Sequence, residues 1–276
     1  MYFYIHTPLD ISEGSISALA NRLEPYTRDL GIREVVIRFR RRKELYEPPI
    51  PMELVLYRSG TYRLVLNQKE PDSAPIPSLN AYDLRVLRAQ KYGYLYPYEI
   101  IRMLEGVSIR NRPLLHKDMR GGEFTEYDFD EHGSFVPVNR PYGQNTCGVV
   151  VGIISNKTRQ HQDGMKRVWI GSDPTRSMGA LAEQECKRIQ ACIQLARTHA
   201  LPIEWIPISA GAKIAMDSGT ENLDWTAIVM RELVQFAEDR SHSASGMVNI
   251  IVYGTNVGAQ SYWNAQANML MHTKGI

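Results

Sequence analysis

Cysteine is scarce in this sequence. The chain of 276 residues contains three, Cys147, Cys186 and Cys192, and no two of them form a Cys-x-x-Cys pair. A disulfide framework needs more cysteines at closer spacing, and a zinc ribbon needs paired cysteines, so both are excluded. Free thiols suit a reducing compartment, and we therefore expect a cytoplasmic protein. The seven histidines are dispersed without metal-ligand spacing, so we expect no bound metal.

Long hydrophobic runs and a strong excess of one charge are also missing. No apolar stretch approaches the ~18 residues that a transmembrane helix requires, and the N-terminus lacks the basic start and apolar centre of a signal peptide. The formal net charge of +2 gives no broad attraction to nucleic acid or to a membrane surface. Hydrophobic residues make up 43% of the chain and charged residues 22%, which is typical of a soluble globular protein.

Several catalytic motifs are absent as well. The chain has no P-loop and no glycine-rich ATP loop, so any ATP-dependent step belongs to another protein or domain. No Gly-x-Ser-x-Gly elbow accompanies Asp217, Ser218 or His272, which leaves a hydrolytic triad unsupported. Asp173 and Glu183 are candidates for residues that flank a substrate channel, although surface or capping roles are the simpler interpretation. The sequence therefore indicates no acid–base pair of side chains.

Residues 1–78 are predicted to form a small α/β domain. Apolar residues at helical spacing predict a helix over 15–30, which Ser12 begins and Gly31 ends. Strands are predicted over 2–6, 35–40, 52–57 and 62–67. Three prolines among polar residues predict a linker over 68–78, so we place the boundary with a second domain, 79–276, at that point.

The second domain alternates strands and helices. A short helix is predicted over 96–104, followed by an exposed loop over 111–122. The order is then strand, strand, helix, strand, helix, strand, helix, over 149–155, 167–170, 182–196, 203–208, 223–238, 248–253 and 261–272. This alternation predicts the α/β fold class.

Two glycine-containing segments follow the strands predicted at 203–208 and 248–253. The first reads Ser209-Ala-Gly-Ala-Lys213 and the second reads Gly254-Thr-Asn-Val-Gly258. We expect a helix to begin at each, with Gly211 and Ala212 as its first residues in the first case. Such turns leave clusters of free backbone N–H groups, which bind anions or stabilise oxyanions. Tight turns that simply need small residues are the alternative interpretation.

Many short matches in the same order give the chain a family resemblance. They include Tyr94-Leu-Tyr-Pro-Tyr-Glu99, Asn145-Thr-Cys-Gly-Val-Val-Val-Gly, Trp169-Ile-Gly-Ser-Asp-Pro-Thr175 and the stretch 203–212. With these, residues 84–276 resemble the N-terminal half of a biotin-dependent acyl-CoA carboxyltransferase, as in the carboxyltransferase region of multidomain acetyl-CoA carboxylases. Residues 1–78 resemble, more loosely, the end of the non-catalytic central region. The separate bacterial subunits of this kind carry a four-cysteine zinc ribbon, which this chain lacks.

The resemblance implies a crotonase-like (ClpP/crotonase) ββα superhelix and transfer of CO2 from carboxybiotin to acetyl-CoA, which gives malonyl-CoA. In this scheme biotin releases CO2, its ureido anion takes the α-proton of the thioester, and the enolate attacks CO2. Two oxyanion holes serve the reaction without a side-chain base. By resemblance, the N–H groups of Gly211 and Ala212 lie near the thioester, and those of Val257 and Gly258 receive the ureido oxygen of biotin.

Substrate binding is assigned by the same resemblance to Ser209, Ala210 and Lys213. The family usually has arginine where this chain has Lys213. Lysine keeps the positive charge but loses the two-pronged geometry of the guanidinium group. A solvated lysine with no ligand is the alternative interpretation of this position.

Partners are also implied. Biotin arrives on a carrier domain, a biotin carboxylase uses the ATP, and a C-terminal half completes the carboxyltransferase. The family's site forms between two protomers, so we expect a homodimer. The sequence ends at Ile276, where a further strand is expected. We therefore expect a fragment, or one piece of a split enzyme.

Two other functions stay open at this point. A stand-alone crotonase-type enzyme, either a hydratase or a thioester hydrolase, requires a glutamate pair or a nucleophile near Gly211 or Gly258, and the sequence indicates neither. A non-catalytic scaffold of a carboxylase complex does not require intact glycine turns. Binding of coenzyme A separates the scaffold from the enzymes.

Overall fold

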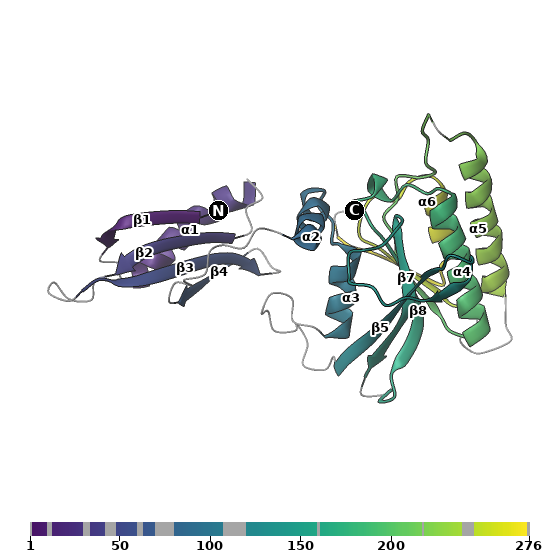
Figure 1. The fold of residues 1–276 in the computed structure, drawn as a ribbon, viewed down its shortest axis with the longest axis horizontal. Coiled ribbons are helices and arrows are strands. Elements are labelled where there is room, and N and C mark those ends of the chain that lie inside the picture. Colours follow the sequence, from purple (N-terminus) through teal and green to yellow (C-terminus); the bar gives the residue numbers. More distant parts are fainter. Residues whose placement is uncertain are drawn as a thin grey trace. The chain divides into compact units, whose positions relative to one another are not determined.

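The computed structural model describes residues 2–9, 13–29, 34–41, 48–59, 63–69, 80–106, 120–158, 161–216, 218–238 and 246–274. The chain divides into two compact units, Met1–Ser78 and Leu79–Ile276 (Figure 1). Each unit has its own sheet and its own hydrophobic core. The predicted helix ends at Ser12 and Gly31, most of the loop predicted over 111–122, and Asp217 lie outside the described residues.

The first unit is a four-stranded sheet with one helix, and it contains the helix and the four strands predicted for it. Its elements are β1 Tyr2–Leu9, α1 Glu13–Asp29, β2 Glu34–Arg41, β3 Ile50–Ser59 and β4 Arg63–Lys69, with the strands in this order across the sheet. Strand β1 is parallel to β2, and the other pairs are antiparallel. Because alternate residues of a strand face the same side, Val35, Ile37 and Phe39 form one core with Ile16 of α1.

The second unit is built on a seven-stranded sheet in the order β11-β10-β9-β8-β7-β5-β6. The strands are β5 Arg120–Phe129, β6 Phe135–Pro137, β7 Val149–Lys157, β8 Met165–Ser172, β9 Ile203–Ile206, β10 Val248–Val252 and β11 Met269–His272. Strands β8 to β11 are parallel to one another, whereas β5, β6 and β7 pair antiparallel. The carboxyl ends of β8 to β11 therefore meet at one edge, where ligands bind in open α/β sheets.

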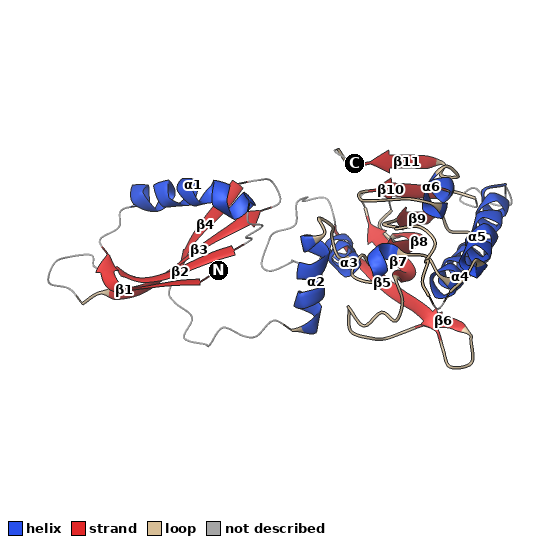
Figure 2. Cartoon of the chain, turned by 90° about the horizontal axis from the view of Figure 1, so that it is seen from above, coloured by secondary structure: helices blue, strands red, loops and turns tan. Residues whose placement is uncertain are grey.

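Helices cover both faces of this sheet, which confirms the predicted α/β class (Figure 2). Helices α4 Glu183–His199 and α5 Glu221–Glu238 pack on one face, and α2 Ala81–Lys91 and α3 Pro97–Glu105 lie on the other. Strand β8 shows the alternation, because Val168 and Ile170 belong to the α4 core and Trp169 to the α3 core. Within the described ranges, no helix is long and apolar enough to span a membrane.

The prediction of a helix over 261–272 is wrong in its second half, where the chain forms strand β11. Helix α6, Ala259–Asn264, ends early, and β11 then pairs with β10. Asn268 redirects the chain, because its N–H donates to the Val248 carbonyl (2.8 Å) and its side-chain oxygen accepts the Val248 N–H (2.7 Å). An asparagine side chain that bonds the backbone of a strand competes with helix continuation. The periodic apolar residues after it therefore form the edge of the sheet.

The α4 core supplies a test of this packing. Ile189 is fully buried between α4 and the sheet, and we expect Ile189→Ala to lower the free energy of unfolding by about 2–5 kcal/mol through lost burial and the cavity left behind. Gln184→Ala, at an exposed position of the same helix, should change it by less than about 0.5 kcal/mol. All four tryptophans lie in the second unit, so tryptophan fluorescence during urea unfolding reports this unit alone. Equal effects of the two substitutions would contradict the assigned core.

Candidate active site

The two glycine-containing segments lie side by side at the carboxyl ends of the neighbouring parallel strands β9 and β10. We call residues 209–213 the first turn and residues 254–258 the second turn. A parallel bridge between Ser209 and Asn256 joins them. In it the Ser209 N–H donates to the Thr255 carbonyl (2.8 Å), and the Val257 N–H donates to the Ser209 carbonyl (3.1 Å). Two segments that are far apart in the sequence thus form one surface.

Gly211 and Gly258 meet where the turns touch. Both have positive φ, +90° and +61°, which side-chain-bearing residues rarely adopt. A Cβ atom on Gly258 would lie 3.2 Å from the Gly211 Cα and 4.0 Å from the Ala212 nitrogen. A larger residue at 258 would therefore push the first turn away. Both glycines are therefore favoured by their backbone conformation, and Gly258 also by its close approach to Gly211.

The prediction that Gly211 and Ala212 begin a helix is wrong. The next helix, α5, starts at Glu221. Instead the first turn pairs with Leu181, whose N–H donates to the Gly211 carbonyl (2.8 Å) and whose carbonyl accepts the Lys213 N–H (2.7 Å). In this extended pairing the Gly211 carbonyl and the Lys213 N–H both have hydrogen-bond partners, so the chain does not need a helix to satisfy them.

Each of the two predicted amide pairs, Gly211 with Ala212 and Val257 with Gly258, leaves one N–H group open. The Gly211 N–H donates to the Ser209 Oγ (3.0 Å), and the Val257 N–H is used by the bridge. Among the described residues, the N–H groups of Ala212 and Gly258 have no acceptor. We call these two groups the open amides. One member of each predicted amide pair is thus committed to the protein, and the other is available to a ligand.

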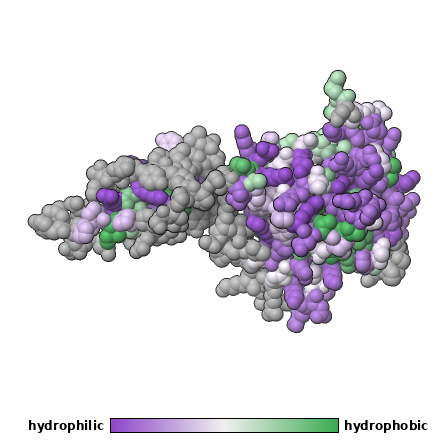
Figure 3. Space-filling view, viewed as in Figure 1, coloured by the Kyte–Doolittle hydropathy of each residue, from purple (hydrophilic) through white to green (hydrophobic). Residues whose placement is uncertain are grey.

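The remaining predicted residues of the first turn differ in exposure. Ser209 is fully buried, Ala210 is exposed, and Lys213 is half-buried. The Lys213 backbone is held on both sides, because its carbonyl also accepts the Asn222 side-chain amide (2.9 Å). The next residue, Ile214, is 94% exposed. The face of this unit that Figure 3 shows is mostly hydrophilic.

Tyr94 supports the second turn from outside, a contact that the sequence did not predict. Its hydroxyl pairs with the Thr255 hydroxyl (2.7 Å) and accepts the Thr255 N–H (3.4 Å). Its ring lies against Gly254, where a Cβ atom would be 2.6 Å from the ring. Tyr253 meets the Tyr94 ring edge-on and donates to the Leu95 carbonyl (3.1 Å). The segment before α3 therefore fixes the start of the second turn.

The segment that follows β8 supports the first turn. The Ala210 N–H donates to the carbonyl of Met178 (3.1 Å), which lies in a run of three left-handed residues, Ser177, Met178 and Gly179. Left-handed serine and methionine are strained, and such strain persists only where the surroundings impose it. Here a Cβ on Gly179 would collide with the carbonyl of Ile208, so the strained segment is pressed directly against the first turn.

Asp173 anchors this strained segment. It is fully buried, accepts the Thr175 N–H (2.9 Å) and hydroxyl (2.6 Å), and accepts the Asn145 side-chain amide (2.8 Å). The side-chain oxygen of Asn145 in turn accepts hydrogen bonds from the Arg85 guanidinium group (3.1 Å) and the Tyr96 hydroxyl (3.3 Å). All of these hydrogen bonds of Asp173 are to other residues of the protein. Glu183, the other residue predicted to flank a substrate channel, is exposed and forms an ion pair with Lys187.

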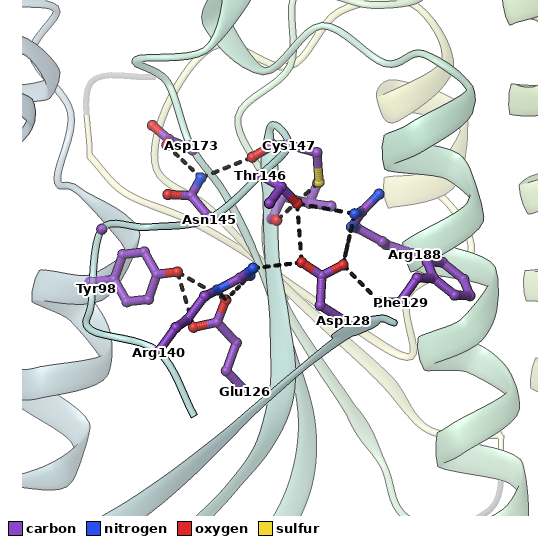
Figure 4. Close-up of polar contacts among 12 residues, drawn as sticks. Tyr98, Glu126, Asp128, Phe129, Arg140, Asn145, Thr146, Cys147, Asp173 and Arg188 are labelled. Atoms are coloured by element: carbon purple, nitrogen blue, oxygen red, sulfur yellow. Dashed lines mark hydrogen bonds and ion pairs between the residues drawn. The ribbon is translucent and has the colours of Figure 1, made fainter. Parts of the chain in front are cut away.

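A buried charged cluster lies next to Asn145, as Figure 4 shows. The carboxylate of Asp128 accepts hydrogen bonds from the guanidinium groups of Arg140 (2.7 Å) and Arg188 (2.8 Å). Glu126 accepts the Tyr98 hydroxyl (3.0 Å) and the Nε of the same Arg140 (3.0 Å). Two carboxylates thus balance two guanidinium groups, which burial of charge requires. The cluster ties β5, α3, α4 and the segment before β7 together.

The pKa values of the two carboxylates move in opposite directions. Burial raises the pKa of Glu126 above its ordinary value, and Arg140 offsets only part of this. Burial also acts to raise the pKa of Asp128, but the hydrogen bond from Arg140 and the charge of Arg188 outweigh it and lower the pKa. Asp128 is therefore stabilised as a carboxylate by the folded state.

Cysteine and metal chemistry are not indicated by the geometry. All three cysteines are buried, and burial raises the pKa of Cys147 to about 11 and that of Cys186 to about 12. Such thiols stay protonated at neutral pH and are poor nucleophiles. In the part of the chain that the structure describes, no group of three or more His, Cys, Asp or Glu is arranged to hold a metal ion.

A groove of about 490 Å³ lies elsewhere on the second unit. Its lining includes Glu123 and Tyr127 of β5, Lys166 of β8 and His199 of α4. Lys166 is at the amino end of β8, whereas the two turns follow the carboxyl ends of the parallel strands. The groove is therefore separate from the candidate site.

Comparison with known proteins gives the chain relatives but no family. No protein-family model matches. The acetyl-CoA carboxylase of Schizosaccharomyces pombe is 28% identical over 155 residues, which are 53% of this chain and 7% of that protein. Acetyl-CoA carboxylase 2 of Arabidopsis thaliana is 30% identical over 83 residues, 30% of this chain and 4% of that protein. The acetyl-CoA carboxylase of Saccharomyces cerevisiae is 30% identical over 87 residues, 32% of this chain and 4% of that protein.

These relatives confirm the resemblance predicted from the sequence. The chain is similar to a part of acetyl-CoA carboxylases, and the matched part is a small fraction of each of them.

Asp128 is the test of the charged cluster. At neutral pH Asp128→Asn removes the negative charge that pairs with Arg140 and Arg188. We expect the unpaired positive charge to lower the free energy of unfolding by about 3 kcal/mol. Glu183→Gln, which breaks an exposed pair with Lys187, should change it by no more than about 1 kcal/mol.

The pH dependence of this difference follows from the lowered pKa of Asp128. The stabilisation is complete above the ordinary carboxyl pKa and is lost as the pH falls through the lower folded value. In urea unfolding followed by tryptophan fluorescence, the gap between wild type and Asp128→Asn should therefore shrink in acid. A gap that stays constant from neutral pH into that acid range would contradict the role of Asp128.

Proposed function

We propose that residues 79–276 are the N-terminal, crotonase-like half of a carboxyltransferase that transfers CO2 from carboxybiotin to acetyl-CoA and gives malonyl-CoA. The observation that carries the proposal is the contact of the two turns, which leaves the open amides of Ala212 and Gly258 in one small area. Similarity to acetyl-CoA carboxylases over about half of the chain supports it independently. The matched part is 7% of the length of the acetyl-CoA carboxylase of Schizosaccharomyces pombe.

The open amides fit a reaction in which negative charge develops on oxygen. A thioester carbonyl gains such charge when the adjacent carbon loses its proton, and a backbone N–H aimed at that oxygen stabilises it by roughly 3–4 kcal/mol. The amides are held by bonds of their neighbours to Ser209 and Leu181, so they need little reorganisation during the reaction. We assign the Ala212 N–H to the thioester oxygen.

The second turn fits the ureido group of biotin. Gly258 is exposed, has no side chain, and presents an open N–H, so a planar group with an oxygen acceptor can approach its backbone. Carboxybiotin, when bound, supplies the carboxyl group. The role of this chain is to hold the ureido oxygen at the Gly258 N–H and to leave the Val257 N–H in the bridge.

A reaction without a side-chain base agrees with the residues around the turns. Asp173 is buried and fully engaged in structural bonds, and the buried thiols stay protonated. The half-buried Lys213 supplies positive charge at the end of the first turn, and we assign it to the acyl-CoA. This combination favours enolate chemistry over the hydratase and hydrolase alternatives.

The proposal includes partners for the remaining steps. A carrier domain brings biotin, a biotin carboxylase uses the ATP, and a C-terminal half completes the site in a homodimer. Residues 1–78 are assigned to the end of the carboxylase central region. A scaffold without catalysis is the alternative, and it predicts no binding of acetyl-CoA at the turns.

Gly258 tests the proposed biotin step. In the complete carboxylase that contains this chain, we expect Gly258→Val to lower turnover about 100-fold or more, because the side chain meets the first turn and covers the open amide. Gly133→Val is the matched control, because Gly133 also has positive φ but has nothing within 4 Å of its added Cβ. Near-normal turnover of a folded Gly258→Val enzyme would refute the assignment.

Lys213 tests the acyl-CoA side. A charge-assisted bond in a partly dry pocket contributes roughly 1.5–3 kcal/mol, so Lys213→Ala should weaken acetyl-CoA binding about tenfold or more. Lys213→Arg should retain it, and the loss should diminish at high salt. Calorimetric titration of acetyl-CoA measures each variant, with Lys187→Ala on α4 as the control. If Lys213→Ala binds like wild type, the lysine does not contact the acyl-CoA.

A further inference from the structure

The open N–H of Ala212 and the carbonyl of Gly211 belong to one peptide group. This peptide is trans and planar, so the two groups point in opposite directions and can turn only together. The Leu181 N–H donates to the Gly211 carbonyl at 2.8 Å. The bond that fixes the open amide therefore comes from the segment that follows β8, and the amide points away from Leu181.

The first turn lies between two neighbouring segments. Because β9 lies between β8 and β10 in the sheet, the turn after β9 has the segment after β8 on one side and the second turn on the other. Leu181 pairs with Ala212 on the first side, and the bridge through Ser209 is on the second. The Ala212 N–H therefore points toward the second turn. In agreement, a Cβ atom on Gly258 would lie 4.0 Å from the Ala212 nitrogen.

Gly179 allows the segment after β8 to lie this close to the first turn. Gly179 is buried and has a φ of +69°. A Cβ atom there would collide with the Ile208 carbonyl oxygen and would lie 2.9 Å from the carbonyl carbon. Because these are backbone atoms at the end of β9, they cannot move aside as a flexible side chain can. A side chain at position 179 must therefore push the segment, with Leu181, away from Gly211.

We propose that Gly179 is a positioning residue that acts through Leu181. Its missing side chain lets the Leu181 N–H hold the Gly211 carbonyl, and this bond directs the Ala212 amide toward the thioester oxygen. The inference rests on the proposed function and deepens it, because it assigns the alignment of the thioester step to a buried residue outside both turns.

Hydrogen exchange of the full chain tests the geometric part without any reaction. In Gly179→Ala the methyl group displaces the segment, and we expect exchange of the Leu181 N–H to accelerate at least about tenfold. Exchange of the Ile203 N–H of β9, which donates to the Met247 carbonyl (2.8 Å), should stay within about threefold. Gly133→Ala is the matched control and should alter neither, because Gly133 has positive φ but open space around an added Cβ. Unchanged exchange at Leu181, or equal acceleration at Ile203, would overturn the proposal.

An ester between Ala180 and Leu181 tests the catalytic part, and it decides the matter if Gly179→Ala does not fold. Leucic acid, the hydroxy analogue of leucine, is placed at position 181 of the complete carboxylase. Its ester oxygen cannot donate to the Gly211 carbonyl, whereas the Leu181 carbonyl still accepts the Lys213 N–H. We expect kcat to fall about 10- to 100-fold, with the KM for acetyl-CoA within about threefold, because the misdirected amide acts on charge that develops in the transition state.

The same ester at Leu201 is the matched control. The Leu201 N–H donates to the Ala196 carbonyl (2.9 Å), and Leu201 precedes the amino end of β9, away from the turns. This ester also removes one backbone hydrogen bond of a leucine, and it should lower kcat less than about threefold.

The outcomes separate this proposal from the proposed function. Normal kcat in the Leu181 ester enzyme would overturn the positioning role and leave the carboxyltransferase assignment intact. A raised KM with unchanged kcat would also overturn it, because Leu181 would then affect substrate binding alone. A wild-type enzyme that forms no malonyl-CoA from carboxybiotin and acetyl-CoA would instead refute the proposed function, whatever the exchange rates show.

Discussion

The close contact of Gly211 with Gly258 is the constraint on which the candidate site depends. Parallel pairing of β9 with β10 brings both strand ends to the same edge of the sheet, and the bridge through Ser209 continues that pairing into the turns. Gly258 passes close to Gly211 because it has no side chain, and both residues adopt the positive φ that glycine allows. The outcome is a surface of backbone groups that includes the open amides of Ala212 and Gly258.

Support for this surface comes from both sides of the sheet edge. Tyr94 holds the second turn, and the strained residues after Asp173 hold the first. Asp173 is linked through Asn145 to the segment beside the charged cluster of Glu126, Asp128, Arg140 and Arg188 (Figure 4). Buried ion pairs of this kind are weak contributors to stability, but removal of one partner is severe. Here they link β5, α3 and α4 to the segment before β7.

Sequence patterns predicted the parts of the fold that depend on local periodicity. The helix at α4 and the strands at β7 to β10 follow from apolar spacing, and the resemblance to acetyl-CoA carboxylases followed from short ordered matches. The prediction failed where a distant backbone partner decides the outcome. Leu181 converts the expected helix start at Gly211 into an extended pairing, and Val248 draws the residues after Asn268 into a strand. Tyr94 and Thr255, 161 positions apart, show why long-range contacts leave no local signal.

In the proposed reaction, the Ala212 and Gly258 amides donate hydrogen bonds to oxygens of the two reactants. The most direct test is an NMR titration of the 15N-labelled chain, first with acetyl-CoA and then with biocytin. We expect acetyl-CoA to shift the resonance of the Ala212 amide and biocytin to shift that of the Gly258 amide. The Gly211 and Val257 amides should shift less, because they keep their protein acceptors. Saturation with both compounds without a change at Ala212 or Gly258 would contradict the account.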